Sequence, residues 1–159
     1  MSGRTYRGLV LDPFQEEALT AIDHGKSVIV AAPTGTGKTL VADYLVDQVM
    51  TQGRRIIYTA PIKALSNQKY KDYKVLFGEE KVGILTGDVV LNSEAPLLIM
   101  TTEIFRNQVI TNDPALNEVS YIIFDEIHWL NDEERGTVWE ESIILAPPHM
   151  KMLGLSATI

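Results

Sequence analysis

The sequence predicts an α/β domain of three layers, in which helices cover both faces of a mostly parallel β-sheet. Short runs that are apolar throughout alternate with longer helical segments, which is typical of parallel sheets buried on both faces. Polar clusters directly follow several of these runs. Within the 159 residues no repeat, low-complexity tract or linker interrupts the alternation, so we expect a single domain.

The expected elements follow one another as strand and helix in turn. Strands are expected at residues 27–32, 54–60, 82–85, 97–101, 121–125 and 152–155, and helices at 38–50, 63–77, 103–110 and 138–145. In the first of these helices Val41, Leu45 and Val49 recur at helical spacing. Asn112-Asp113-Pro114 and Pro147-Pro148 end the last two helices. Ligands of such sheets bind beyond the carboxyl ends of the strands, so we expect the functional site there.

The composition excludes several classes of protein. Hydrophobic residues make up 45% and charged residues 22%, an ordinary globular balance, and no apolar run approaches the roughly 18 residues of a membrane span. Cysteine is absent, which excludes disulfides and thiolate metal sites. The N-terminus lacks a secretory signal, so we expect an intracellular protein, cytoplasmic by default or nuclear in a eukaryote. A net charge of -7 argues against a generic nucleic-acid coat but leaves room for a local binding groove.

A glycine-rich segment, Ala32-Pro33-Thr34-Gly35-Thr36-Gly37-Lys38-Thr39, lies between the first strand and the first helix. In that position it predicts a loop whose backbone N–H groups and helix N-terminus surround phosphate oxygens. Lys38 would reach the β- and γ-phosphates of ATP, and the Thr39 hydroxyl would ligate Mg²⁺. The alternative is a plain strand-to-helix turn with a surface lysine.

An acidic segment, Asp125-Glu126-Ile127-His128, leaves the strand at 121–125. If that strand neighbours the one before the phosphate loop, Asp125 could hold Mg²⁺ through water and Glu126 could polarise the water that attacks the γ-phosphate. The alternative is a solvated acidic loop. His128 has no second histidine at ligand spacing, so hydrogen bonding or coupling is favoured over metal binding.

Together with the terminal Ser156-Ala157-Thr158, these two segments resemble the first motor domain of superfamily-two helicases. In that family an alanine also replaces the usual first glycine of the loop, as Ala32 does here. Three further segments look like that family's nucleic-acid-contacting segments: Thr59–Tyr70, Thr86–Asp88 and Met100–Ile104. Asn131–Gly136 with Val138–Glu141 is similar to the stretch after the acidic segment in Ski-like helicases, the RNA helicases that feed the RNA exosome. The resemblance runs from about Leu11 to Ile159. The acidic segment reads DEIH where that subfamily usually has DEVH, a change that leaves the chemistry unaltered.

The resemblance implies a RecA-like P-loop NTPase fold and a role for each matching residue. Gln15 would read the adenine edge with Phe14 or an upstream aromatic nearby, and residues 33–39 would hold the ATP phosphates. The backbone of single-stranded RNA would lie along Pro61, Lys63, Gly87, Thr102 and Glu103. His128, Ser156 and Thr158 would couple the two sites. Without the resemblance, Gln15 and Lys63 could instead face solvent at helix starts, and Ser156 and Thr158 could be a small polar strand end.

The family's motor has a second RecA-like domain that supplies arginine fingers, and no Gln-x-x-Gly-Arg-x-x-Arg-like string occurs in residues 1–159. We therefore expect this chain to be the helicase ATP-binding domain of a longer RNA helicase. We expect that protein to act with an RNA-degradation complex and not at a membrane, and we expect the isolated chain to hydrolyse ATP weakly. The rival functions are a DNA helicase of the related repair branch, a nucleotide-switched binding module, and a small-molecule kinase or GTPase.

Overall fold

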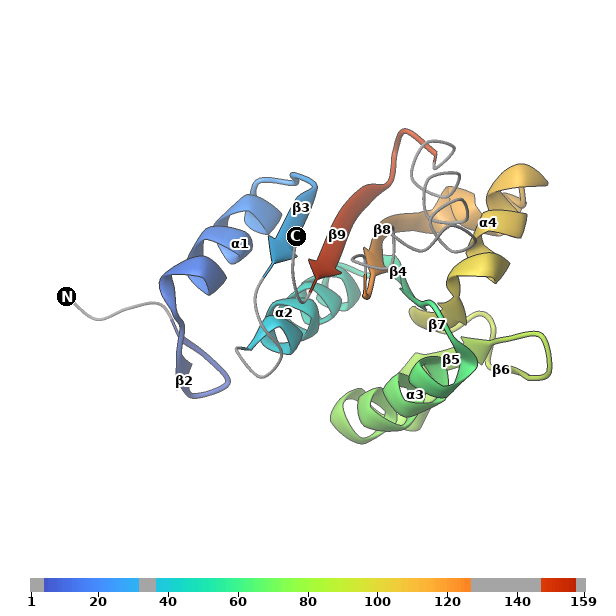
Figure 1. Ribbon diagram of the computed structural model, residues 1–159, viewed down its shortest axis with the longest axis horizontal. Helices are drawn as coiled ribbons and strands as arrows, with labels where there is room; N and C mark the ends of the chain where they lie inside the picture. The colour runs from blue at the N-terminus through green and yellow to red at the C-terminus, as the bar shows by residue number, and fades with distance from the viewer. Residues whose placement is uncertain (1–4, 32–36, 127–146, 157–159) are drawn as a thin grey trace.

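The computed structural model describes residues 5–31, 37–126 and 147–156 and shows a seven-stranded sheet with the strand order β3-β9-β8-β4-β7-β5-β6 (Figure 1). Its strands are β3 (Val28–Ala31), β4 (Arg55–Ala60), β5 (Val82–Leu85), β6 (Val90–Leu91), β7 (Leu97–Thr101), β8 (Val119–Phe124) and β9 (Lys151–Ser156). The described helices are α1 (Pro13–Asp23), α2 (Lys38–Thr51), α3 (Lys63–Phe77) and α4 (Thr102–Ile110), with 3₁₀ turns at Glu79–Lys81 and Pro114–Glu118. A small hairpin, β1 (Thr5–Tyr6) and β2 (Leu9–Val10), precedes α1.

The sheet is mostly parallel, as predicted. Each pairing from β3 through to β5 is parallel, and β6 alone pairs antiparallel, with β5. Every expected strand and helix in the described ranges is present with its ends shifted by at most two residues. The expected helix at 138–145 lies outside the described residues. No described helix is both long and apolar enough to cross a membrane.

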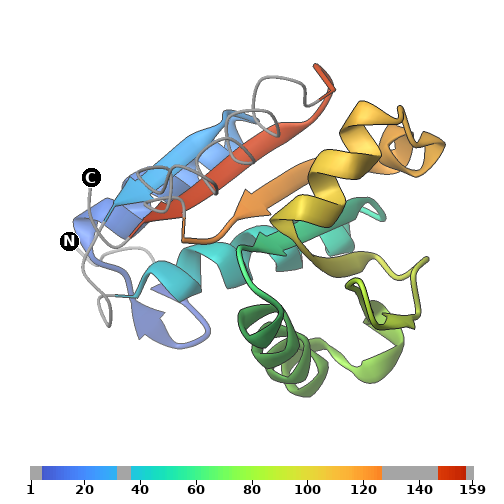
Figure 2. The ribbon, with the colours of Figure 1, turned by 45° about the vertical axis from the view of Figure 1, so that its right-hand side comes forward.

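Two apolar clusters cover the two faces of the sheet, because successive strand side chains point to opposite faces. Ile56 and Tyr58 of β4 pack with α1, α2 and α3, whereas Ile57 between them packs with α4 on the other face. The turned view in Figure 2 shows α4 on the opposite side of the strands from α3. This arrangement confirms the three layers and leaves the carboxyl edge of the sheet for the polar residues.

Helix α1 and the N-terminal hairpin were not predicted. The helix begins with a proline after Asp12, and the Gln15 side chain accepts a hydrogen bond from the Asp12 backbone N–H at 2.7 Å, the reciprocal half of a capping box. Its buried positions are Gln15, Ala18, Leu19 and Ile22. A glutamine at the first buried position interrupts the apolar pattern, although the proline and the capping pair were visible in the sequence.

Candidate functional site

The polar residues selected from the sequence lie at one edge of the sheet. Because the strands from β3 to β5 are parallel, their carboxyl ends meet at that edge. The last strand residues there, in sheet order, are Ala31, Ser156, Phe124, Ala60, Thr101 and Leu85. One expectation needs correction: β3 and β8 are not neighbours, because β9 lies between them. The phosphate-loop strand and the acidic strand therefore meet across the end of β9, where Ser156 is buried.

The start of α2 has the properties of an anion site. Gly37 is its N-cap residue and adopts a left-handed backbone with φ of 94°, which favours glycine. No side chain caps this end and no acidic residue occupies the first turn. The positive end of the helix is therefore available to a bound anion. Lys38 is partly exposed and Thr39 is exposed. The donor chemistry thus fits phosphate oxygens at the helix end, with a hydroxyl beside them for a hard cation.

Gln15 lies against the end of the phosphate loop. Its Nε2 donates to the Gly37 carbonyl at 3.0 Å, and the side chain is 5% exposed. A Cβ on Gly37 would meet that Nε2 at 2.3 Å, so a side chain there would displace the end of Gln15 and would also strain the left-handed backbone. The Gln15 amide, predicted to read the adenine edge, thus holds α1 against the loop. Phe14 is partly buried against the apolar core, and Tyr6, the upstream aromatic, donates to Asp47 on α2 at 3.1 Å.

Asp125 follows β8 and is held by three hydrogen bonds. Its backbone N–H donates to the Thr59 carbonyl at 2.9 Å. Its carboxylate accepts from the Tyr58 hydroxyl at 2.5 Å and from the Glu126 backbone N–H at 2.8 Å. The carboxylate remains partly exposed, and each carboxylate oxygen can accept more than one hydrogen bond. It can therefore keep these partners and still accept a bond from a cation's water.

Glu126 has a strained backbone. Its φ of 59° lies in the left-handed region, which costs a non-glycine residue of the order of 1 kcal/mol or more and concentrates at functional sites. The side chain is partly exposed at the carboxyl edge. Asp125 and Glu126 therefore differ in their surroundings, since Asp125 accepts a bond from buried Tyr58 and Glu126 has the left-handed backbone.

Sequence reasoning missed Tyr58, the buried partner of Asp125. Tyr58 is 1% exposed, and burial first and the Asp125 charge second raise its pKa well above the usual value. Its ring meets the Tyr73 ring edge-on, with centroids 5.6 Å apart. Burial, and then the charge of Asp43 on α2, raises the pKa of Tyr73. Tyr58 therefore remains a protonated donor, and its signal in the sequence was a tyrosine hydroxyl within a mostly apolar strand.

Replacing Tyr58 with phenylalanine is expected to lower the free energy of unfolding by about 1.5 kcal/mol, the low end for a hydrogen bond to a charged group, since Asp125 can recover some solvation. Urea denaturation would measure the change. Tyr70→Phe on α3 is the matched control, because that partly exposed ring packs under Lys74 at 4.3 Å. Equal stability losses in the two variants would contradict the special role of the Tyr58 hydroxyl.

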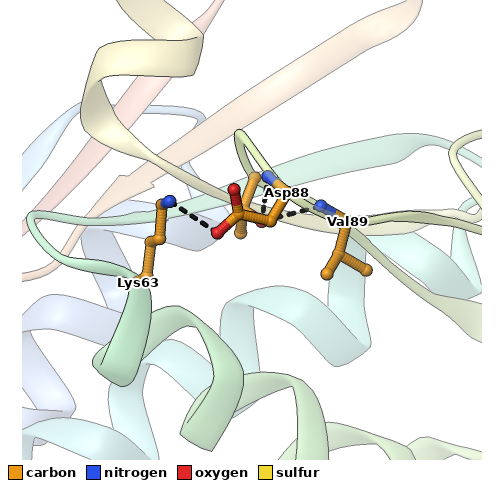
Figure 3. Close-up of polar contacts among 4 residues, drawn as sticks. Lys63, Asp88 and Val89 are labelled. Atoms are coloured by element: carbon orange, nitrogen blue, oxygen red, sulfur yellow. Dashed lines mark hydrogen bonds and ion pairs between the residues drawn. The ribbon is translucent and has the colours of Figure 1, made fainter.

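The residues assigned to the nucleic acid follow β4, β5 and β7. Lys63 is the first residue of α3, and its Nζ lies 2.6 Å from a carboxylate oxygen of Asp88, in the turn after β5 (Figure 3). Gly87 is exposed beside the end of the lysine side chain, and Pro61 is partly exposed. Glu103 is exposed, but Thr102 is 3% exposed and its Oγ1 has no hydrogen-bond partner within the described residues. The Thr102 hydroxyl is therefore below the surface that the other four present.

Several predicted site residues lie outside the described ranges. They are Pro33, Thr34, Gly35, Thr36, His128 and Thr158. Within the described residues no group of three or more His, Cys, Asp or Glu side chains is arranged to hold a metal. The phosphate-site residues that are described, Gly37, Lys38 and Thr39, form the start of α2 as the sequence predicted.

A parallel α/β sheet with a glycine-capped helix start after its edge strand and acidic residues after an inner strand defines a RecA-like nucleotide-binding domain. The family model described as DEAD/DEAH box helicase matches residues 12–159. The chain belongs to this family, and membership implies the use of a nucleotide. The resemblance seen in the sequence to superfamily-two helicases is thereby confirmed.

Curated relatives are similar over nearly the whole chain. It is 50% identical over 149 residues to "DExH-box ATP-dependent RNA helicase DExH9" of Arabidopsis thaliana, covering 94% of this chain and 15% of that protein. It is 50% identical over 156 residues to "ATP-dependent RNA helicase mtr4" of Schizosaccharomyces pombe, covering 98% and 14%. It is 48% identical over 149 residues to "Antiviral helicase SKI2" of Saccharomyces cerevisiae, covering 94% and 12%. The chain thus spans under a sixth of the length of these relatives.

Solved structures share the fold. The helicase domain of Hef from Pyrococcus furiosus superposes with a TM-score of 0.72 at 26% identity, covering 91% of this chain and 33% of that one. The DUF1998 helicase MrfA, determined with DNA and AMPPNP, gives a TM-score of 0.75 at 21% identity, covering 96% and 25%. At that identity the second likeness establishes the fold alone.

Proposed function

We propose that this chain is the ATP-binding motor domain of an ATP-dependent RNA helicase, in which hydrolysis of Mg²⁺-bound ATP is coupled to movement along single-stranded RNA. The observation that carries the proposal is the order of the polar strand ends along the sheet. Residues suited to ATP follow β3 and β8, and residues suited to a sugar-phosphate backbone follow β4, β7 and β5. The named relatives support RNA as the track, because two of them are called ATP-dependent RNA helicases.

In the ATP half, this chain's residues bind the phosphates and position water. The N–H groups at the start of α2, those of residues 33–36 and the Lys38 ammonium hold the phosphates. Thr39 and Asp125 are the protein groups that would hold Mg²⁺, and the ion would supply positive charge to the transferred phosphoryl group. Glu126 orients the attacking water and accepts its proton. Gln15 secures the end of the loop through the Gly37 carbonyl, and the second N–H of its amide is the donor we propose for adenine.

In the RNA half, the contacts are suited to backbone rather than base recognition. Lys63 offers one ammonium to a phosphate, and Pro61, Gly87 and Glu103 present surface at the same edge. Such contacts position a strand without reading its sequence. For Thr102 we propose contact through the backbone at the start of α4, since its hydroxyl is buried.

The two halves meet where β8 pairs with β4. Tyr58 of β4 donates to Asp125 after β8, while the next residues along the β4 connection lead to Pro61 and Lys63. On the other side of β8, Ser156 ends β9 and is buried. A shift of the acidic residues during hydrolysis would therefore act on both neighbouring strands, and His128 and Thr158 are proposed to take part in this coupling.

The test compares RNA with DNA as the activator of the full-length protein. We expect single-stranded RNA to stimulate ATP hydrolysis and DNA of the same sequence and length to stimulate it less. Stronger stimulation by DNA would show that DNA, and not RNA, is the track, and would favour the DNA helicase of the repair branch. Hydrolysis that neither polymer changes would favour a nucleotide-switched binding module.

The 159-residue chain alone is expected to bind ATP weakly and to hydrolyse it at least about 10³-fold more slowly than the full-length protein, because arginine fingers of a second RecA-like domain contribute that much to such reactions. Single-turnover hydrolysis under saturating ATP would measure the difference. Brisk, RNA-stimulated hydrolysis by the isolated chain would show that no second domain is needed. An RNA-degradation complex as the partner of the full-length protein belongs to the same proposal and would be tested by co-purification.

A further inference from the structure

We propose that the Asp88 carboxylate competes with the RNA backbone for the Lys63 ammonium. Asp88 holds this ammonium when no RNA phosphate is bound to it. The inference rests on the proposed function, since it assigns Lys63 to the RNA track, and it adds a residue that regulates how tightly the track is held. The juxtaposition of the two side chains is seen in Figure 3.

The position of Asp88 is fixed by its own turn. The Thr86 hydroxyl accepts hydrogen bonds from the backbone N–H groups of Asp88 at 3.3 Å and Val89 at 3.2 Å, and the Thr86 N–H donates to the Val89 carbonyl at 2.9 Å. Thr86 itself is 5% exposed. Asp88 contributes only its backbone to this turn, so its carboxylate is held by hydrogen bonds of the backbone and can act on Lys63.

Lys63 needs an anionic partner where it lies. It is the first residue of α3, a helix with no acidic residue in its first turn and no side-chain cap. The positive end of the helix dipole repels an ammonium at that position. The Asp88 carboxylate, 2.6 Å from Nζ, offsets this repulsion, and an RNA phosphate within reach of Nζ would also offset it.

The ion pair between Lys63 and Asp88 is weak enough for an RNA phosphate to replace the carboxylate. The Lys63 and Asp88 side chains are 53% and 71% exposed, so the bond is screened by water and salt. Ion pairs of this kind bias the lysine toward its partner by about 1.4- to 5-fold. The apparent dissociation constant for a ligand rises as the binding-competent fraction of the protein falls. Asp88 should therefore weaken RNA binding by a small factor, which suits a motor that must release its track at every step.

The experiment measures binding of a labelled single-stranded oligouridine RNA to the full-length protein without nucleotide. Asp88→Asn removes the charge and keeps the shape and the backbone bonds of the turn. We expect it to tighten RNA binding two- to fivefold. In a Lys63→Ala background, where RNA binding is already weakened, the same substitution is expected to change the affinity by less than about 1.5-fold, because no lysine is left to release.

The Lys63→Ala background separates competition from a general charge effect. Equal tightening by Asp88→Asn with and without Lys63 would overturn the proposal, since loss of any nearby negative charge would then explain the result. Unchanged or weaker binding in Asp88→Asn alone would also overturn it. Asp72→Asn on α3, where the carboxylate accepts from Gln68 at 2.9 Å, is the matched control and should leave RNA affinity unchanged. If Lys63→Ala itself leaves RNA affinity unchanged, the assignment of Lys63 to the track has failed instead.

Discussion

Replacing Lys38 with alanine is expected to abolish ATP binding at concentrations that saturate the unaltered protein. The lysine stands at the start of α2, directly after the left-handed Gly37. In the proposed complex it makes charge-assisted bonds to two phosphates, each worth about 1.5–3 kcal/mol. Losing both corresponds to an affinity loss of about 10²–10⁴-fold. Equilibrium binding of a fluorescent ATP analogue would measure it.

The matched control for Lys38 is Lys71→Ala, which removes an exposed lysine from the middle of α3. That variant should bind the analogue normally. Unchanged ATP affinity in Lys38→Ala would refute the role of this helix start as the phosphate site. A loss in both variants would point to a general effect of charge on the nucleotide.

Replacing Glu126 with glutamine is expected to leave ATP binding intact and to slow hydrolysis by about 10²–10⁴-fold, the usual contribution of a general base. Glutamine has the shape of the carboxylate and can occupy the same left-handed backbone, but it cannot accept the proton of the attacking water. Steady-state hydrolysis and ATP binding would be measured on the same preparation of the full-length protein. RNA binding in the presence of ATP should persist, because the nucleotide is no longer consumed.

Glu17→Gln controls for the loss of one negative charge, since Glu17 is exposed on α1 away from β8. It should hydrolyse ATP at the normal rate. Near-normal turnover in Glu126→Gln would remove Glu126 as the base. The role would then pass to a group outside the described residues or to the proposed second RecA-like domain.

The main sheet was predictable because its strands are buried on both faces. Runs such as those of β4, β7 and β8 are mostly apolar, and residues of both clusters alternate along them. The strand ends were predicted to within two residues. Helix α1 was missed because its first buried residue is Gln15, whose burial depends on hydrogen bonds to Asp12 and Gly37 and not on an apolar side chain.

The residues of the candidate site could be predicted where they lie in one segment of the sequence. They could not be predicted where their role depends on contact between two distant segments. Glycine, lysine and threonine at the start of α2, and the two carboxylates after β8, are local signals. The strand order is not, so the sequence could not reveal that β9 separates β3 from β8. Tyr58 was missed as a site residue for the same reason, and Asp88 was noted only as part of the segment Thr86–Asp88, with no role of its own. Their importance comes from Asp125, 67 residues away in the chain, and from Lys63, 25 residues away.

The measurement that tests the central proposal most directly is strand separation by the full-length protein. An RNA duplex with a single-stranded overhang is mixed with protein and ATP, and the release of the labelled strand is followed over time. We expect release that requires ATP, that is lost in Lys38→Ala and in Glu126→Gln, and that is faster on RNA than on a DNA duplex of the same sequence. Release at the same rate without ATP, or in the Lys38 variant, would contradict the account.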